Sequence, residues 1–161
     1  MNSQLILIVD DEIPNLVSLS ALLEEEYEVL MATNGVEALA LAESRRPDLI
    51  ILDINMPDMD GFEACKRLKE NPATAETPVL FLSGLGDRIN EEKGLRLGAV
   101  DYITKPIVPA IVQVRVQIHL NNLNNIRFLR TLLKEKSEFL AESQKEAAGL
   151  LKKMEKRRWF S

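Results

Sequence analysis

The sequence predicts an α/β fold in which a doubly wound, five-stranded parallel sheet is followed by an extended C-terminal helix. Short runs of consecutive apolar residues alternate with segments of helical spacing, which is typical of parallel strands covered on both faces. All seven prolines and six of the seven glycines occur before residue 110. The segment that follows therefore has almost no turn signals and is predicted to be helical.

The first half of the chain alternates strands with helices. Leu5–Val9 and Leu49–Leu52 are continuous apolar runs, so each is predicted to be a buried strand. Between them, leucines at helical spacing predict a helix over 14–26, and 28–32 is predicted to be a second strand. The next helix is expected to end at Pro47, because proline interrupts the hydrogen bonding of a helix.

The second half continues the alternation. A polar loop over 55–61 leads to a third helix, and 79–82 is an apolar run that predicts the fourth strand. A helix is expected over 88–97 and a fifth strand over 100–103. The third helix is expected to turn three apolar residues inward, with Cys65 as a small buried hydrophobe: Phe62, Cys65 and Leu68.

Polar side chains follow four of the predicted strands. In a doubly wound sheet, ligands bind outside the carboxyl ends of the strands, where the strand order reverses. The residues at those ends are Asp10, Asp11, Asp53, Ser83 and Lys105. We therefore expect three carboxylates, a hydroxyl and an ammonium group to meet in one crevice.

This set of groups suits phosphoryl transfer. Clustered carboxylates repel one another unless a cation compensates them, and Mg²⁺ prefers such hard oxygen ligands. Asp53 could attack a phosphoryl group as a carboxylate nucleophile. Lys105 would supply a second counter-charge, and Ser83 would donate a hydrogen bond to a phosphoryl oxygen.

Four motifs resemble the receiver domain of bacterial two-component response regulators over about residues 4–120. They are V-D-D-E (9–12), L-D-I-N-M-P-D-M-D-G (52–61), L-S-G (82–84) and D-Y-I-T-K-P (101–106). The resemblance implies a flavodoxin-like sheet of strand order 2-1-3-4-5. It also implies a phosphoryl-accepting signalling protein whose donor is a histidine kinase, a phosphotransfer protein or a small phosphate ester or anhydride.

The resemblance also implies a role for each site residue. Asp53 matches the phosphoacceptor, and Asp10 and Asp11 match the acidic pair that organises Mg²⁺. Asn55 matches the position whose backbone carbonyl is a metal ligand.

Three further positions match the switching machinery of that family. Ser83 and Lys105 match the hydroxyl and the lysine that contact the phosphoryl group, and Tyr102 matches the aromatic ring that swings inward when the hydroxyl moves. Leu85, two residues after Ser83, is apolar and could hinder the water that hydrolyses the acyl phosphate.

Other interpretations of these residues are available. Asp10 and Asp11 could cap the first helix, and Tyr102 could be a rim residue of the core. A phosphoaspartyl-type hydrolase would need a general acid or base two residues after the nucleophile, where this chain has Asn55. A flavin-binding module would need a loop rich in Gly, Ser and Thr after the first strand, where this chain has acidic residues.

The expected domains are 1–120, the sheet-forming part, and 121–161, a helical extension. The last helix of the first domain is expected to face the sheet with three apolar residues at helical spacing: Ile111, Val114 and Ile118. Apolar residues recur every seven positions in the extension, as d positions of a heptad would: Ile126, Leu133, Leu140, Ala147 and Met154. The matching a positions are mostly polar: Leu123, Arg130, Ser137, Gln144, Leu151 and Arg158. Three interpretations of this extension remain open. It could form a parallel homodimer through a marginal coiled coil, connect the first domain to an output domain or effector, or be a solvated helix that frays from Ser137 onward.

Composition and charge limit the function classes. Cys65 is the only cysteine, which excludes an intrachain disulfide framework. Residues 1–106 hold 20 acidic and 9 basic side chains, a net charge of −11, whereas 107–161 hold 5 and 11, a net charge of +6. No signal peptide, membrane span or nucleic-acid-binding motif is visible, so a cytoplasmic protein is expected and membrane contact by the basic C-terminal end is not favoured. His119 is expected on a helix surface or seam.

Overall fold

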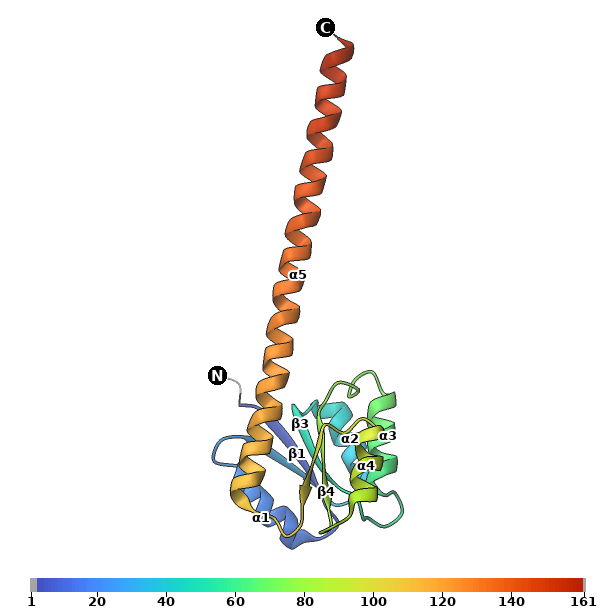
Figure 1. Ribbon diagram of the computed structural model, residues 1–161, viewed down its shortest axis with the longest axis vertical. Helices are drawn as coiled ribbons and strands as arrows, with labels where there is room; N and C mark the ends of the chain where they lie inside the picture. The colour runs from blue at the N-terminus through green and yellow to red at the C-terminus, as the bar shows by residue number, and fades with distance from the viewer. Residues whose placement is uncertain (1–2, 161) are drawn as a thin grey trace. The chain divides into compact units, whose positions relative to one another are not determined.

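The computed structural model describes residues 3–160, which contain one five-stranded parallel sheet with the order β2-β1-β3-β4-β5 (Figure 1). The strands are β1 Leu5–Val9, β2 Glu28–Ala32, β3 Leu49–Asp53, β4 Val79–Ser83 and β5 Asp101–Thr104. The helices are α1 Ile13–Leu23, α2 Gly35–Arg45, α3 Gly61–Glu70, α4 Arg88–Arg96 and α5 Pro109–Trp159. The predicted fold and strand order are confirmed, and the predicted strand bounds agree with the structure to within one residue.

Helices cover both faces of the sheet (Figure 1). One face packs against α1 and the first turns of α5, and the other packs against α2, α3 and α4. Every residue of β1, β3 and β4 is buried, because these central strands are covered on both sides. This explains why their sequences are continuous apolar runs, whereas the edge strands β2 and β5 each have one buried residue and are otherwise partly or fully exposed. The inward residues predicted for α3, Cys65 among them, are all buried.

The start of α5 presents a different face to the sheet from the one predicted. Val112, Val116 and Leu120 are buried against it. The residues predicted to face the sheet, Ile111, Val114 and Ile118, are instead 46%, 54% and 49% exposed. The helix carries two apolar stripes that differ by about one residue, or roughly 100° of rotation, and the docking of the helix on the sheet selects one of them. The other stripe remains an exposed apolar surface.

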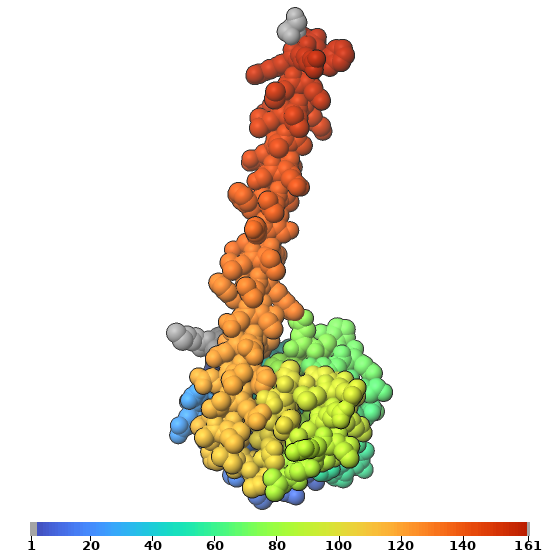
Figure 2. Space-filling model, in the orientation of Figure 1, coloured from blue at the N-terminus to red at the C-terminus, as the bar shows by residue number. Residues whose placement is uncertain are grey.

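The chain divides into two compact units, one up to Leu123 and one from Asn124 onward. In the second unit, residues 124–159 are helical throughout, and all of them are exposed in this structure (Figure 2). The helix ends at Trp159 and is not interrupted at Ser137, where the sequence allowed fraying. Within residues 3–160, no helix combines the length and the apolar character that crossing a membrane requires.

Candidate functional site

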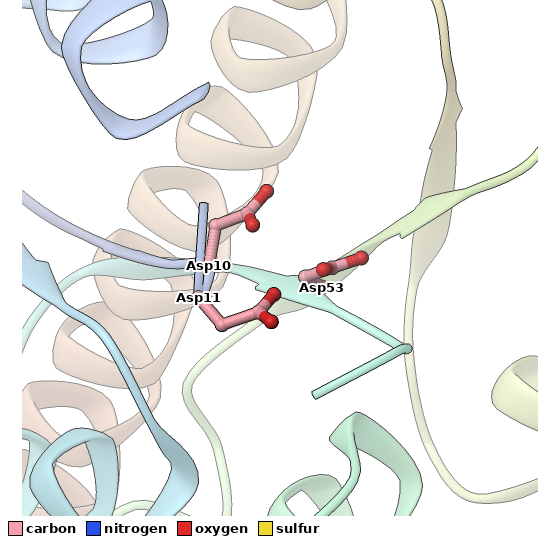
Figure 3. Close-up of side chains that lie close together, drawn as sticks. All are labelled: Asp10, Asp11 and Asp53. Carbon is pink, nitrogen blue, oxygen red and sulfur yellow. The ribbon is translucent and has the colours of Figure 1, made fainter. Parts of the chain in front are cut away.

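Three carboxylates gather at the carboxyl ends of β1 and β3 (Figure 3). Val9 pairs with Leu52 in the parallel register, so the residues that follow, Asp10 and Asp53, meet at one edge of the sheet. One oxygen of each, together with one of Asp11, lies within 4.8 Å of the others. Asp10 and Asp53 are buried, at 0% and 3% exposed, whereas Asp11 is exposed to solvent.

The carboxylate of Asp10 is held in place by the turn before α1. Its Oδ1 accepts the backbone N–H of Glu12 at 2.9 Å, and its Oδ2 accepts Nδ2 of Asn15 at 3.0 Å. The N-cap position of α1 belongs to Glu12, which makes no capping bond with its side chain. Neither Asp10 nor Asp11 is therefore the N-cap of this helix, and Asp10 is oriented toward the site.

Lys105 provides the positive charge nearest the cluster. Its Nζ donates to Oδ1 of Asp53 at 3.1 Å and lies 3.5 Å from Oδ2 of Asp10. Burial, and then the charge of Asp10, raise the pKa of Asp53 to about 6, although Lys105 opposes this rise. Burial disfavours the charged form of Lys105, but its bonds to the two aspartates raise its pKa overall.

The charge balance of the cluster suits a divalent cation. Among residues 3–160, three carboxylates face one ammonium group, and two of these carboxylates are removed from solvent. Hard oxygen ligands at this separation are those that Mg²⁺ takes in proteins, usually with several waters retained. Asn55 lies two residues after Asp53, in the loop between β3 and α3, and is exposed.

Gly61 allows the β3–α3 loop to close against Asp53. Its backbone N–H donates to the carbonyl of Ile54 at 2.8 Å. A Cβ atom at this position would lie 2.2 Å from the carbonyl oxygen of Asp53, well inside a normal contact. The sequence contains Gly61 within the second motif, but nothing in its pattern indicates this close approach.

The hydroxyl of Ser83 is hydrogen-bonded to α4. Ser83 is 1% exposed, and its carbonyl accepts the backbone N–H of Lys105 at 2.7 Å. Its Oγ donates to Oε1 of Glu91 on α4 at 3.4 Å. Glu91 is not predicted from the sequence, because no motif marks it and the contact depends on where α4 docks.

Tyr102 lies beside a polar cluster on β5 and α5. The guanidinium carbon of Arg115 lies 5.6 Å from the centre of its ring. Arg115 donates to Oδ1 of Asp101 at 2.6 Å, and Nε2 of His119 lies 2.9 Å from Oδ2 of Asp101. Burial opposes ionisation of Asp101, but its hydrogen bonds with His119, the Tyr102 backbone and Arg115 lower its pKa overall. His119 is therefore a packed partner of β5.

The predicted site residues thus fall into two groups. Asp10, Asp11, Asp53 and Lys105 are brought together, as their positions at strand ends predict. Ser83 and Tyr102 lie on the adjoining strands β4 and β5, but their side chains contact Glu91 and Arg115.

The family of response regulator receiver domains matches residues 6–117 of the chain. A protein of Vibrio cholerae named "probable cyclic di-GMP phosphodiesterase" is 35% identical over 150 residues, which is 93% of this chain and 33% of that protein. Response regulator PleD of Caulobacter vibrioides is 44% identical over 113 residues, 70% of this chain and 25% of that protein. The chain therefore spans only a quarter to a third of the length of these two relatives.

The solved structures agree with this relationship. The chemotaxis response regulator CheY4 of Vibrio cholerae, 34% identical, superimposes with a TM-score of 0.70 over 73% of this chain and 99% of that one. The similarity to the phosphodiesterase relative extends further along the chain than the similarity to CheY4. An alignment of 150 residues in a chain of 161 must reach at least residue 150. That similarity continues into the helical second unit.

Proposed function

Because the chain belongs to the response regulator receiver domain family, we propose that Asp53 accepts a phosphoryl group in a two-component signalling system. One observation carries this proposal. The Asp53 carboxylate is buried at a strand end, bonded to Lys105 at 3.1 Å, and shares its site with two further carboxylates. The donor would be a phosphohistidine of a sensor histidine kinase or phosphotransfer protein, or a small acyl phosphate.

The transfer is a displacement at phosphorus. A carboxylate oxygen of Asp53 forms a bond to phosphorus while the bond from phosphorus to the donor nitrogen or oxygen breaks. The donor atom leaves with the bonding electron pair, and an imidazole leaving group takes a proton from solvent. Lys105 stays beside Asp53 and compensates the charge of the phosphoryl oxygens.

Asp10, Asp11 and Asp53 form a donor set that fits Mg²⁺. The backbone carbonyl of Asn55 would be a fourth ligand. The ion, when bound, would neutralise charge on the carboxylates and on the transferred group. Asp10 is oriented for this role by its bonds from Glu12 and Asn15.

We further propose that Ser83 and Tyr102 transmit phosphorylation to the surface formed by α4, β5 and α5. The Ser83 hydroxyl would turn from Glu91 to the phosphoryl group, and Tyr102 would rotate toward the space that Ser83 leaves. This surface carries exposed apolar side chains suited to a partner: Leu85, Leu95, Val100, Val108 and Ile111. The receiver itself would modify its own Asp53 rather than an outside substrate.

The helical second unit would transmit the phosphorylation state of Asp53 to a second copy of the chain or to another domain. Its exposed apolar side chains support pairing with a second copy of the chain. The similarity to the phosphodiesterase relative through residue 150 favours a second candidate, a connection to an output domain that degrades cyclic di-GMP. Sequencing the gene beyond codon 161 would test this candidate, because a short remaining reading frame would contradict it.

The phosphoacceptor proposal is tested with the purified chain, acetyl phosphate and Mg²⁺. Mass spectrometry of the intact protein should show one added phosphoryl group that survives acid and is lost in base. Asp53→Asn should remove the adduct, and chelation of the metal should prevent its formation. Asp58→Asn is the matched control, because Asp58 is an exposed acid of the same loop whose positive φ of 66° asparagine also tolerates. Full labelling of the Asp53 variant would contradict the assignment.

A further inference from the structure

The Ser83 hydroxyl already has an acceptor in this structure, and that acceptor lies on α4. Ser83 is 1% exposed, and its Oγ lies 3.4 Å from Oε1 of Glu91. A buried hydroxyl that gives up one hydrogen bond without gaining another loses stability. The hydroxyl therefore turns toward Asp53 without a loss of hydrogen bonding when an acceptor within its reach, such as a phosphoryl oxygen on Asp53, replaces Glu91.

Helix α4 is weakly attached to the rest of the domain. Gly94 is its only buried residue, and its N-cap, Asp87, makes no capping bond with its side chain. By comparison, α3 buries five residues and is capped by the side chain of Asp60. The contact from Ser83 to Glu91, although long at 3.4 Å, is one of the contacts that tie the first turn of α4 to the sheet.

Glu91 also carries the charge that a phosphoryl group would repel. It makes no ion pair with any described cation, in contrast to its neighbour Glu92, whose carboxylate bonds Arg96 at 2.8 Å. A dianionic phosphoryl group on Asp53 would compete with Glu91 as the acceptor of the hydrogen bond from the Ser83 hydroxyl. It would also increase the negative charge near Glu91. Both effects would loosen the first turn of α4.

We propose that Glu91 is a positioning residue for Ser83: it holds the hydroxyl turned toward α4 in the unphosphorylated chain and must release it on phosphorylation. The proposal rests on the proposed function of Asp53. It follows that Glu91 opposes the active conformation, and that removing its side chain should favour binding of a phosphoryl group. Because the bond is long, the effect should be about three- to tenfold.

The test measures binding of beryllofluoride with Mg²⁺ to the full chain by calorimetry. Glu91→Ala should bind about three- to tenfold tighter than the wild type, and Glu91→Gln, which keeps an acceptor but loses the charge, should fall between them. Glu92→Ala is the matched control on the same helical turn and should stay within about twofold. In a Ser83→Ala background, Glu91→Ala should change the affinity much less, because only the charge of Glu91 is then removed, whereas a general effect on α4 stability would give the same gain in both backgrounds.

Two results would overturn the inference while leaving the phosphoacceptor intact: equal affinities for Glu91→Ala and the wild type, or the same gain from Glu91→Ala with and without the Ser83 hydroxyl. A wild-type chain that binds no beryllofluoride would instead overturn the proposed function, and this inference with it. Glu91→Gln keeps the test valid if Glu91→Ala unfolds.

Discussion

The ammonium group of Lys105 lies 3.1 Å from the Asp53 carboxylate, yet the pKa of Asp53 is still raised to about 6. One lysine does not compensate the burial of Asp53 and the charge of Asp10 together. The site thus holds excess negative charge before any cation or phosphoryl group arrives. The excess negative charge lowers the stability of the folded chain, as is common where charged groups are gathered at a functional site.

The first prediction is that Asp53→Asn stabilises the metal-free chain at high pH. The pKa of Asp53 in the folded chain, about 6, exceeds its ordinary value of 3.8, so ionisation favours unfolding. The penalty appears as pH rises from 4 to 6 and is complete above about 6. Urea unfolding at pH 8 should show a gain on the order of 2 kcal/mol that shrinks toward pH 4. An equal difference at both pH values would contradict the charge imbalance.

The second prediction concerns acid stability at Asp101. Its pKa is lowered in the folded chain, so its ionised form contributes stability that is present above the ordinary aspartate pKa and is lost as pH falls through the folded value. Asp101→Asn should therefore cost about 1–2 kcal/mol at pH 7 and much less near pH 3, measured by urea unfolding. Glu92→Gln, which breaks an exposed pair with Arg96, should cost less than about 0.5 kcal/mol. A loss at Asp101 that does not change with pH would contradict the role of its charge.

The third prediction is that Gly61→Ala displaces the loop beside the acceptor. Its Cβ would meet the backbone of Asp53 at 2.2 Å, so the loop must shift. We expect a loss of about 1–3 kcal/mol in stability and slower phosphorylation by acetyl phosphate. Gly84→Ala is the control, because no atom lies within 4 Å of a Cβ placed there. Equal behaviour of the two variants would show that the contact is readily relieved.

The fourth prediction is that the helical second unit pairs two chains. Ile126, Leu133 and Leu140 recur every seven residues and are 47%, 67% and 50% exposed. Leu129 and Leu150 extend the same stripe, three residues after Ile126 and Ala147. Sedimentation should show a dimer for the full chain that strengthens or changes with beryllofluoride, and a monomer for a chain ending at Leu123.

A pair of serine variants refines this test. Leu133→Ser should weaken the dimer, whereas Phe128→Ser, an equally exposed residue off the stripe, should not. If the full chain stays monomeric at high micromolar concentration, the helix serves as a connection to another domain and does not pair chains.

The sequence was sufficient to predict the acidic site because parallel strands give their ends a common edge. Continuous apolar runs located β1 and β3, and the aspartates that follow them had to meet there. Lys105 follows β5 by the same logic and lies against Asp53.

Contacts that depend on the docking of helices were not predictable in this way. On α5, Ile111 and Val112 belong to two stripes of similar apolar character, and only the packing on the sheet buries the second. The partners of Ser83 and Asp101 likewise come from α4 and α5, eight and eighteen residues away, at spacings that no motif marks.

The most direct test of the central claim is reductive trapping of the acyl phosphate. The chain is treated with acetyl phosphate and Mg²⁺ and then with borohydride, which converts a phosphorylated aspartate to homoserine, and its peptides are sequenced by mass spectrometry. We expect homoserine at position 53 in the wild type and none in Asp53→Asn. Homoserine at Asp10 or Asp11, or a labelled chain with Asp53 unchanged, would contradict it.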